Sequence, residues 1–159
     1  MKYREVSHAE RLFEILSNPN FTYISVKPKT LEEEIEYIQK AEKGRQENSE
    51  HHFTVFLDSE IVWAFWIKID DSRKHVWKIW CYIDEKYWWK WIANFATRWC
   101  LDFMKNELKL HLCEILAHPD NSWSQALMIK NGFTKVWTMK DYYSINWEFQ
   151  PRDIFYKIL

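Results

Sequence analysis

Residues 83–93 read Ile-Asp-Glu-Lys-Tyr-Trp-Trp-Lys-Trp-Ile-Ala, and this stretch joins two segments of different periodicity. The run Val76–Ile83 before it is rich in β-branched and aromatic residues, which predicts a strand. After it, apolar residues recur at helical spacing from about residue 89 to 108, which predicts a long helix. A strand that leads into a helix N-terminus presents unpaired backbone amides and the positive end of the helix dipole. This junction could therefore hold a pyrophosphate.

The segments around the junction predict the other elements of the fold. Two helices should come first, opened by the capping boxes Ser7-His8-Ala9-Glu10 and Thr30-Leu31-Glu32-Glu33. Strands follow over 52–57, 61–69 and 76–83; after the long helix come a strand over 112–117 and a short helix from about residue 122. Two more strands cover 133–145 and 149–158. The strand-helix-strand unit implies a parallel pair. We therefore expect one α/β (α+β mixed) domain over residues 1–159, with a mostly antiparallel mixed sheet of six to seven strands and about four helices.

Composition excludes several classes of protein. Apolar residues make up 47% of the 159 residues, charged residues 28%, and the net charge is −1. These fractions are typical of a globular protein, and the net charge gives no electrostatic basis for binding nucleic acid or an anionic membrane. No apolar run approaches 18 residues, so we expect a cytoplasmic protein. No His, Cys, Asp or Glu set has metal-ligand spacing, and no nucleophile triad motif is present.

Residues 83–93 also resemble the corresponding loop of the GCN5-related N-acetyltransferase (GNAT) family. In the branch that acetylates protein N-termini, such as those of ribosomal proteins, this loop typically reads Tyr-Trp-Gly-Lys-Gly-Ile-Ala. Three further stretches match in the right order: Glu60-Ile61-Val62, His118-Pro119-Asp120-Asn121 with Ser124, and Lys130-Asn131-Gly132-Phe133. The resemblance extends from about Leu12 to Ile158. It implies a GNAT fold with the parallel pair at the cofactor site, acetyl-CoA as co-substrate, and direct acetyl transfer to a primary amine.

The resemblance also implies roles for individual residues. Backbone around Ile83 would hold the pantetheine arm and polarise the thioester carbonyl, and amides from 89 to 93 would cradle the pyrophosphate. The cofactor-binding set is Ile83, Trp88, Trp89, Lys90, Trp91, Ile92, Ala93, Asn121 and Lys130. Asn121 could instead cap a helix, and Lys130 could be a solvated residue at a helix end.

Three residues are candidates for the catalytic chemistry: Asn121, Ser124 and Glu114. Asn121 would contact the coenzyme arm. Ser124 could protonate the departing thiolate, or make only local bonds in a first helical turn. Glu114 could deprotonate the amine through water, although strand alternation could equally turn it to solvent. Lys78 stands where many relatives carry an acid, and His111 and His118 are more typical of structural or surface histidines.

Glycine and tryptophan counts depart from the family pattern. The chain has 2 glycines and 11 tryptophans, whereas ordinary usage predicts roughly 11 glycines. Nine tryptophans stand at positions where glycine would be expected: Trp63, Trp66, Trp77, Trp80, Trp89, Trp91, Trp123, Trp137 and Trp147. One hypothesis is that these codons are UGA, read as glycine in the source. The alternative is a protein that is rich in tryptophan.

The resulting function prediction has two main branches. The first is an acetyl-CoA-dependent N-acetyltransferase whose acceptor is a protein N-terminus or a small, polyamine-like amine, in a monomer or a homodimer. Literal tryptophans at 89 and 91 would obstruct the phosphate loop, since a backbone that approaches an anion closely favours glycine. They favour the second branch, a non-catalytic GNAT-like binding module. A third reading is a tryptophan-lined binder of sugars or single strands.

Overall fold

The structure is a computed structural model that describes residues 1–24, 27–88, 91–145 and 147–159. It contains two compact units. Unit 1 comprises Met1–Lys68 and Trp80–Lys90, and unit 2 comprises Ile69–Ile79 and Trp91–Leu159. Strand β4 (Val76–Ile83) contributes its first half to unit 2 and its second half to unit 1.

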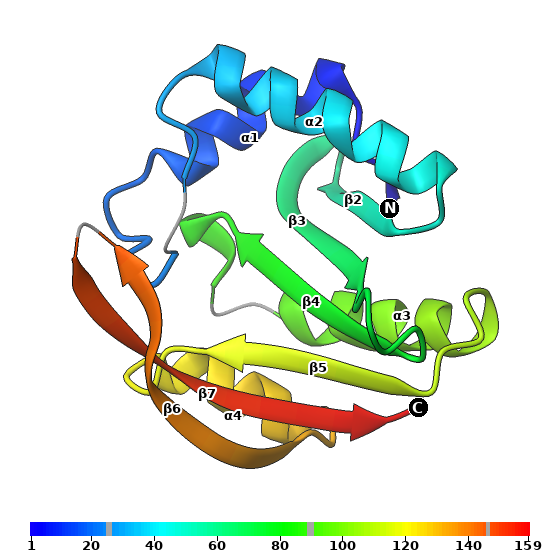
Figure 1. Ribbon diagram of the computed structural model, residues 1–159. Helices are drawn as coiled ribbons and strands as arrows, with labels where there is room; N and C mark the ends of the chain where they lie inside the picture. The colour runs from blue at the N-terminus through cyan, green and yellow to red at the C-terminus, as the bar shows by residue number, and fades with distance from the viewer. Residues whose placement is uncertain (25–26, 89–90, 146) are drawn as a thin grey trace. The chain divides into compact units, whose positions relative to one another are not determined.

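Seven strands occur in the described part of the chain, in the hydrogen-bonded order β1-β2-β3-β4-β5-β7-β6 (Figure 1). The pair β4–β5 is parallel, whereas β1–β2, β2–β3, β5–β7 and β6–β7 are antiparallel. The expected fold class, a mostly antiparallel mixed sheet with one parallel pair and about four helices, is confirmed.

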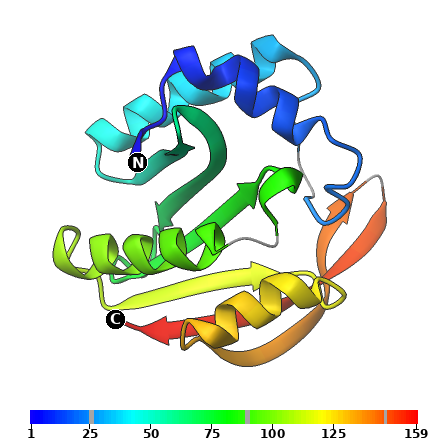
Figure 2. The ribbon, with the colours of Figure 1, turned by 180° about the vertical axis from the view of Figure 1, so that it is seen from behind.

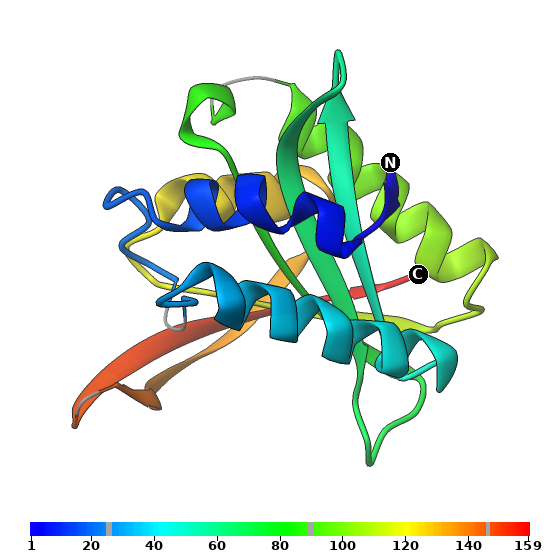
Figure 3. The ribbon, with the colours of Figure 1, turned by 90° about the horizontal axis from the view of Figure 1, so that it is seen from above.

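Unit 1 packs two helices on one face of its strands. The strands are β1 (Lys2–Tyr3), β2 (Glu50–Leu57) and β3 (Glu60–Ile69). Helices α1 (Ala9–Leu16) and α2 (Leu31–Gln46) run side by side in opposite directions over β2 and β3 (Figure 3). Leu12, Ile15 and Leu16 lie on one face of α1 and pack with Ile38 of α2 in a single apolar cluster. This spacing is the i, i+3, i+4 pattern of an amphipathic helix.

Unit 2 contains α3 (Ile92–Asn106), β5 (Leu112–Ala117), α4 (Ser122–Lys130), β6 (Thr134–Ile145) and β7 (Glu148–Ile158). Helices α3 and α4 lie on the same side of β5 and β7 (Figure 2). One face of α3 is buried through Ala96, Cys100 and Met104. Helix α4 ends before Gly132, whose φ of 79° is the left-handed conformation expected of a helix cap.

Several helix boundaries differ from the sequence prediction. The expected Ser7–Glu10 capping box is wrong: Glu5 caps a 3-10 turn over Val6–His8 instead, and its N–H donates to His8 Nδ1 at 3.1 Å. The Thr30 box is confirmed, because Thr30 Oγ1 accepts from Glu33 N at 3.3 Å. A second 3-10 turn, Glu85–Tyr87, follows β4, so α3 begins at Ile92 rather than near residue 89.

None of the helices within the described ranges is long and apolar enough to cross a bilayer.

Candidate functional site

The end of β4 is held by a tryptophan from the turn that follows it. Ile83, the last residue of β4, is buried, and its carbonyl oxygen accepts a hydrogen bond from Trp88 Nε1 at 2.8 Å. Trp88 also packs edge-on against Phe21, with ring centroids 5.6 Å apart. The structure thus brings together two of the predicted site residues, Ile83 and Trp88. The hydrogen bond from the indole therefore restricts the backbone conformation of the turn after β4.

Polar contacts from α1 and the segment after it fix the same turn. Asp84 caps the 3-10 turn by accepting from Lys86 N at 3.1 Å, and its carboxylate also pairs with Arg11. Asn18 and Asn20 each donate to the Glu85 carboxylate at 2.7 Å. Hydrogen bonds to a carboxylate are stronger than those between neutral groups. These contacts position the turn, and sequence reasoning missed them because the partners lie far apart in the chain.

No side chain among the described residues caps the N-terminus of α3. Trp91 occupies the N-cap position, makes no capping hydrogen bond, and is followed by no acidic residue in the first turn. The first amides of a helix have no partner within the helix, so the start of α3 is a candidate site for an anion. The Trp91 indole is 66% exposed and lies edge-on to Phe95 at 5.8 Å between ring centroids. The predicted site residues Trp89 and Lys90 lie outside the described residues.

Asn121 is the N-cap of α4, which was the structural alternative expected for it. Its side-chain oxygen accepts from the backbone N–H of Ser124 at 3.1 Å. Asn121 and Ser124, both predicted site residues, therefore lie next to each other at the start of α4. The cap uses only the oxygen of the Asn121 amide, so its NH₂ group keeps the capacity to donate to a ligand.

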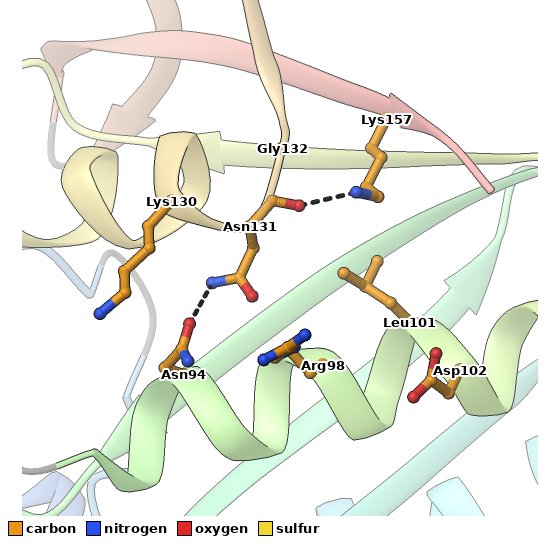
Figure 4. A pocket seen from close by; sticks show the side chains of 8 residues that line it. All are labelled: Asn94, Arg98, Leu101, Asp102, Lys130, Asn131, Gly132 and Lys157. Carbon is orange, nitrogen blue, oxygen red and sulfur yellow. Dashed lines mark hydrogen bonds between the residues drawn. The ribbon is translucent and has the colours of Figure 1, made fainter.

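Lys130 lines a pocket of about 480 Å³ between α3 and the end of α4 (Figure 4). Arg98 and Lys157 also line this pocket, against one acidic residue, Asp102. Asn131 bridges its two sides: its side-chain amide donates to Asn94 Oδ1 at 3.0 Å, and its carbonyl oxygen accepts from Lys157 Nζ at 2.7 Å. The excess of positive charge suits a phosphate.

Glu114 is engaged in an ion pair. Both of its carboxylate oxygens accept from Arg73, at 2.9 and 3.2 Å. Lys78, its parallel register partner on β4, lies 3.5 Å from Asp70, to which Arg73 also pairs. This arrangement ties the start of β4 to β5 and engages both oxygens of the Glu114 carboxylate.

The two histidines that flank β5, His111 and His118, contact neighbouring protein groups. His118 Nδ1 accepts from Asp120 N at 3.2 Å within the loop before α4. His111 lies 6.4 Å from His75, between ring centroids. Among the described residues, no group of three or more His, Cys, Asp and Glu side chains is arranged to hold a metal ion.

The strand order and the parallel β4–β5 pair define the class of the protein as a mixed α/β fold. The model of the acetyltransferase (GNAT) domain matches residues 2–134. The chain therefore belongs to the GNAT acetyltransferase family, and the resemblance that its sequence carries is confirmed. This membership also confirms the expected enzyme class.

Solved structures of acetyltransferases share the fold. The ribosomal L7/L12 α-N-protein acetyltransferase RimL, in complex with coenzyme A, has a TM-score of 0.89 at 18% identity, covering 99% of this chain and 92% of that one. The ribosomal-protein-S5-alanine acetyltransferase from Vibrio fischeri gives 0.87 at 19% identity, with 99% and 91% covered. The microcin C7 self-immunity acetyltransferase MccE, in complex with acetyl-CoA and AMP, gives 0.88 at 16% identity, with 99% and 90% covered. The curated protein sequences gave no match.

Proposed function

We propose that this chain is an acetyl-CoA-dependent N-acetyltransferase that moves the acetyl group directly to a primary amine. The observation that carries the proposal is the start of α3, where the described residues supply neither a side-chain cap nor an acid in the first turn. A diphosphate is the ligand that such a helix end favours. The pocket of Arg98 and Lys130 lies along the same helix, so a second phosphate on the coenzyme has a cationic site within unit 2.

The chemistry requires a neutral amine, a polarised thioester carbonyl and a proton for the leaving thiolate. The amine nitrogen forms a bond to the acetyl carbon and the carbon–sulfur bond breaks; the proton that the amine loses passes to solvent water, and water returns a proton to the group that protonates the thiolate. Backbone near Ile83 is our candidate for polarising the carbonyl, because Trp88 holds it in place. Ser124 is the candidate proton donor to the thiolate, and Asn121 is the candidate contact to the coenzyme arm.

Relatives support the choice of co-substrate and acceptor class. Coenzyme A or acetyl-CoA is bound in the RimL and MccE structures, and RimL is described as acting on a ribosomal protein. For this chain we propose an amine acceptor, either a protein N-terminus or a small amine, and a cytoplasmic setting. Nucleic acid and membrane partners are not expected at a net charge of −1.

One observation favours the non-catalytic alternative. Trp91 places a large indole at the N-cap of α3, the position where glycine would let an anion approach the amides most closely. A GNAT-like module that binds without catalysis is therefore the second candidate for the chain as written.

Calorimetric titration with acetyl-CoA separates the two candidates. We expect the variant Trp89→Gly/Trp91→Gly to bind acetyl-CoA more tightly than the chain as written, and Trp147→Gly, a control of the same type outside this loop, to leave binding unchanged. A double variant that folds and binds no acetyl-CoA would exclude the acetyltransferase proposal.

A further inference from the structure

Unit 1 contains a second pocket, of about 440 Å³, to which no role has been assigned. Its walls are largely apolar and aromatic and include Leu16, Ile24, Pro28 and Tyr37. Two buried charged residues, Arg4 and Glu34, lie among its lining residues, and they are 5% and 1% exposed. The pocket thus combines apolar walls with a pair of ionisable groups that are removed from solvent.

Among the described residues, no group pairs with one edge of the Arg4 guanidinium. Its Nη1 atom lies 3.9 Å from Glu34 Oε1, which exceeds hydrogen-bond distance. Within the described ranges, the Nε and Nη2 atoms of Arg4 are buried and have no hydrogen-bond partner. Three aromatic rings surround the cation, with centroids 5.8 Å away for Tyr37 and Trp66 and 5.9 Å for Tyr82. The rings stabilise the charge but do not satisfy its N–H groups.

A buried cation with unsatisfied donors is unfavourable unless another group pairs with it. Glu34 does so incompletely: burial raises its pKa although Arg4 lowers it, and its Oε1 atom makes no hydrogen bond. The hydroxyl of Tyr82 is a further buried group in this pocket that has no partner among the described residues.

The charged groups at the rim are occupied by their neighbours. Glu33 accepts from Lys29 N at 2.7 Å, Lys40 lies 3.7 Å from Glu36, and Lys27 donates to Asn18 O at 3.3 Å. Arg4 and Tyr82 therefore supply the unsatisfied donors inside the pocket, and a ligand has to bring acceptors.

We infer that this pocket binds the carboxylate of a small aromatic or aliphatic acid. The Nε and Nη2 atoms lie on one edge of the guanidinium and match the two oxygens of a carboxylate, which makes Arg the preferred residue for such groups. The Tyr82 hydroxyl donates a third hydrogen bond, and the apolar walls contact the hydrocarbon part. If the proposed acetyltransferase function holds, on which this step rests, the acceptor is an amino carboxylic acid rather than a polyamine.

The test uses two probes of the same shape, 3-phenylpropanoate and the neutral 3-phenylpropanamide, each titrated into the full chain and followed by protein NMR shifts. We expect the acid to bind at least ~10-fold more tightly than the amide, as for a hydrogen-bonded charge pair. Equal affinities, or no shifts with either probe in a folded protein, overturn the inference.

Variants then assign the binding to Arg4. Arg4→Gln is expected to abolish the preference for the acid, whereas Lys40→Gln, which removes the same charge from the exposed rim, leaves it intact. Because Arg4→Gln could also disturb folding, Tyr82→Phe provides a milder variant, with an expected loss of ~3- to 10-fold for the acid alone. Unchanged acid binding in folded Tyr82→Phe and Arg4→Gln contradicts the assignment.

Acetyl-CoA binding is measured separately on the same protein. Acetyl-CoA binding without acid binding removes this inference and leaves the acetyltransferase proposal standing. Acid binding by the folded Trp89→Gly/Trp91→Gly variant, without acetyl-CoA binding by that variant, does the reverse.

Discussion

Trp147 lies in the turn between β6 and β7 and combines two unfavourable features. Its φ is 68°, in the left-handed region, and its side chain is 91% exposed. A bulky residue is strained there, and the exposed indole gains little from burial. We predict that Trp147→Gly raises the free energy of unfolding by about 1 kcal/mol, as measured by urea denaturation.

Trp137 provides the matched control on the same hairpin. It is 67% exposed, lies within β6, and has no positive φ. Glycine inside a strand is destabilising, so Trp137→Gly should lower stability. A loss of stability in both variants would argue that Trp147 is well accommodated. Opposite signs would fit the idea that glycine belongs at 147.

Glu114 is the predicted general base, and this role stays a prediction. Its two hydrogen bonds to Arg73 place it in a structural ion pair. We predict that Glu114→Gln lowers kcat by less than ~10-fold, below the usual contribution of a general base, and reduces the thermal midpoint. Steady-state kinetics check this: a loss of kcat of ~100-fold or more would restore Glu114 as the base.

At the scale of elements, the N-terminus of α3 serves two needs that oppose each other. A capping carboxylate would stabilise the helix, but it would occupy the amides that an anion requires. We predict that Trp91→Asp raises the thermal midpoint of the protein without ligand and weakens acetyl-CoA binding at least ~10-fold. Trp91→Gly is the control, and it should not weaken binding. Tighter binding by the Asp variant would refute an anion site at this helix end.

The sequence predicted helices and strands correctly where the residues that determine them lie close together in the chain. The bounds of β4 and β5 agree with the structure, and α2 begins at the Thr30 cap as expected. The first helix was wrong in detail because Glu5 and His8 cap a 3-10 turn that competes with the Ser7 motif. Helix α3 starts later than predicted, at Ile92, after a 3-10 turn that Asp84 caps.

The contacts within the candidate site were harder to predict from the sequence. Family motifs pointed to Ile83, Trp88, Asn121 and Ser124, and the structure pairs Ile83 with Trp88 and Asn121 with Ser124. Arg11 and Asn18 could not be found, because no local pattern marks a residue whose partner, Asp84 or Glu85, lies more than sixty positions away. The same holds for the unpaired edge of Arg4, which appears only once α2 and β3 pack around it.

At the scale of the whole molecule, the two units share one continuous strand, β4. A single domain over residues 1–159 stays a prediction, and coincident unfolding of both units by calorimetry would support it.

We expect the loss of folding stability at acid pH to come mainly from protonation of Glu50 of β2. Its carboxylate accepts from His52 at 3.0 Å and pairs with Lys68 at 2.9 Å, which lowers its pKa from 4.5 to about 2. The hydrogen bond from His52 is the largest cause. A depressed carboxyl pKa contributes stability above pH 4.5 that is lost as the pH falls towards 2.

Glu50→Gln should therefore lose about 1 kcal/mol at pH 7, since the group is partly exposed, and its stability should change less between pH 4.5 and 2. Denaturation at several pH values measures both effects. Parallel curves for the variant and the parent chain would contradict the assignment.

Trp66 and Trp80 lie nearly parallel on β3 and β4, with ring centroids 5.8 Å apart and an angle of 12° between planes. Two indoles at this separation couple their electronic transitions and give an exciton couplet in circular dichroism. Glycines cannot produce that signal. The spectrum of the protein purified from its natural source would therefore report directly whether translation inserts tryptophan or glycine at these two positions.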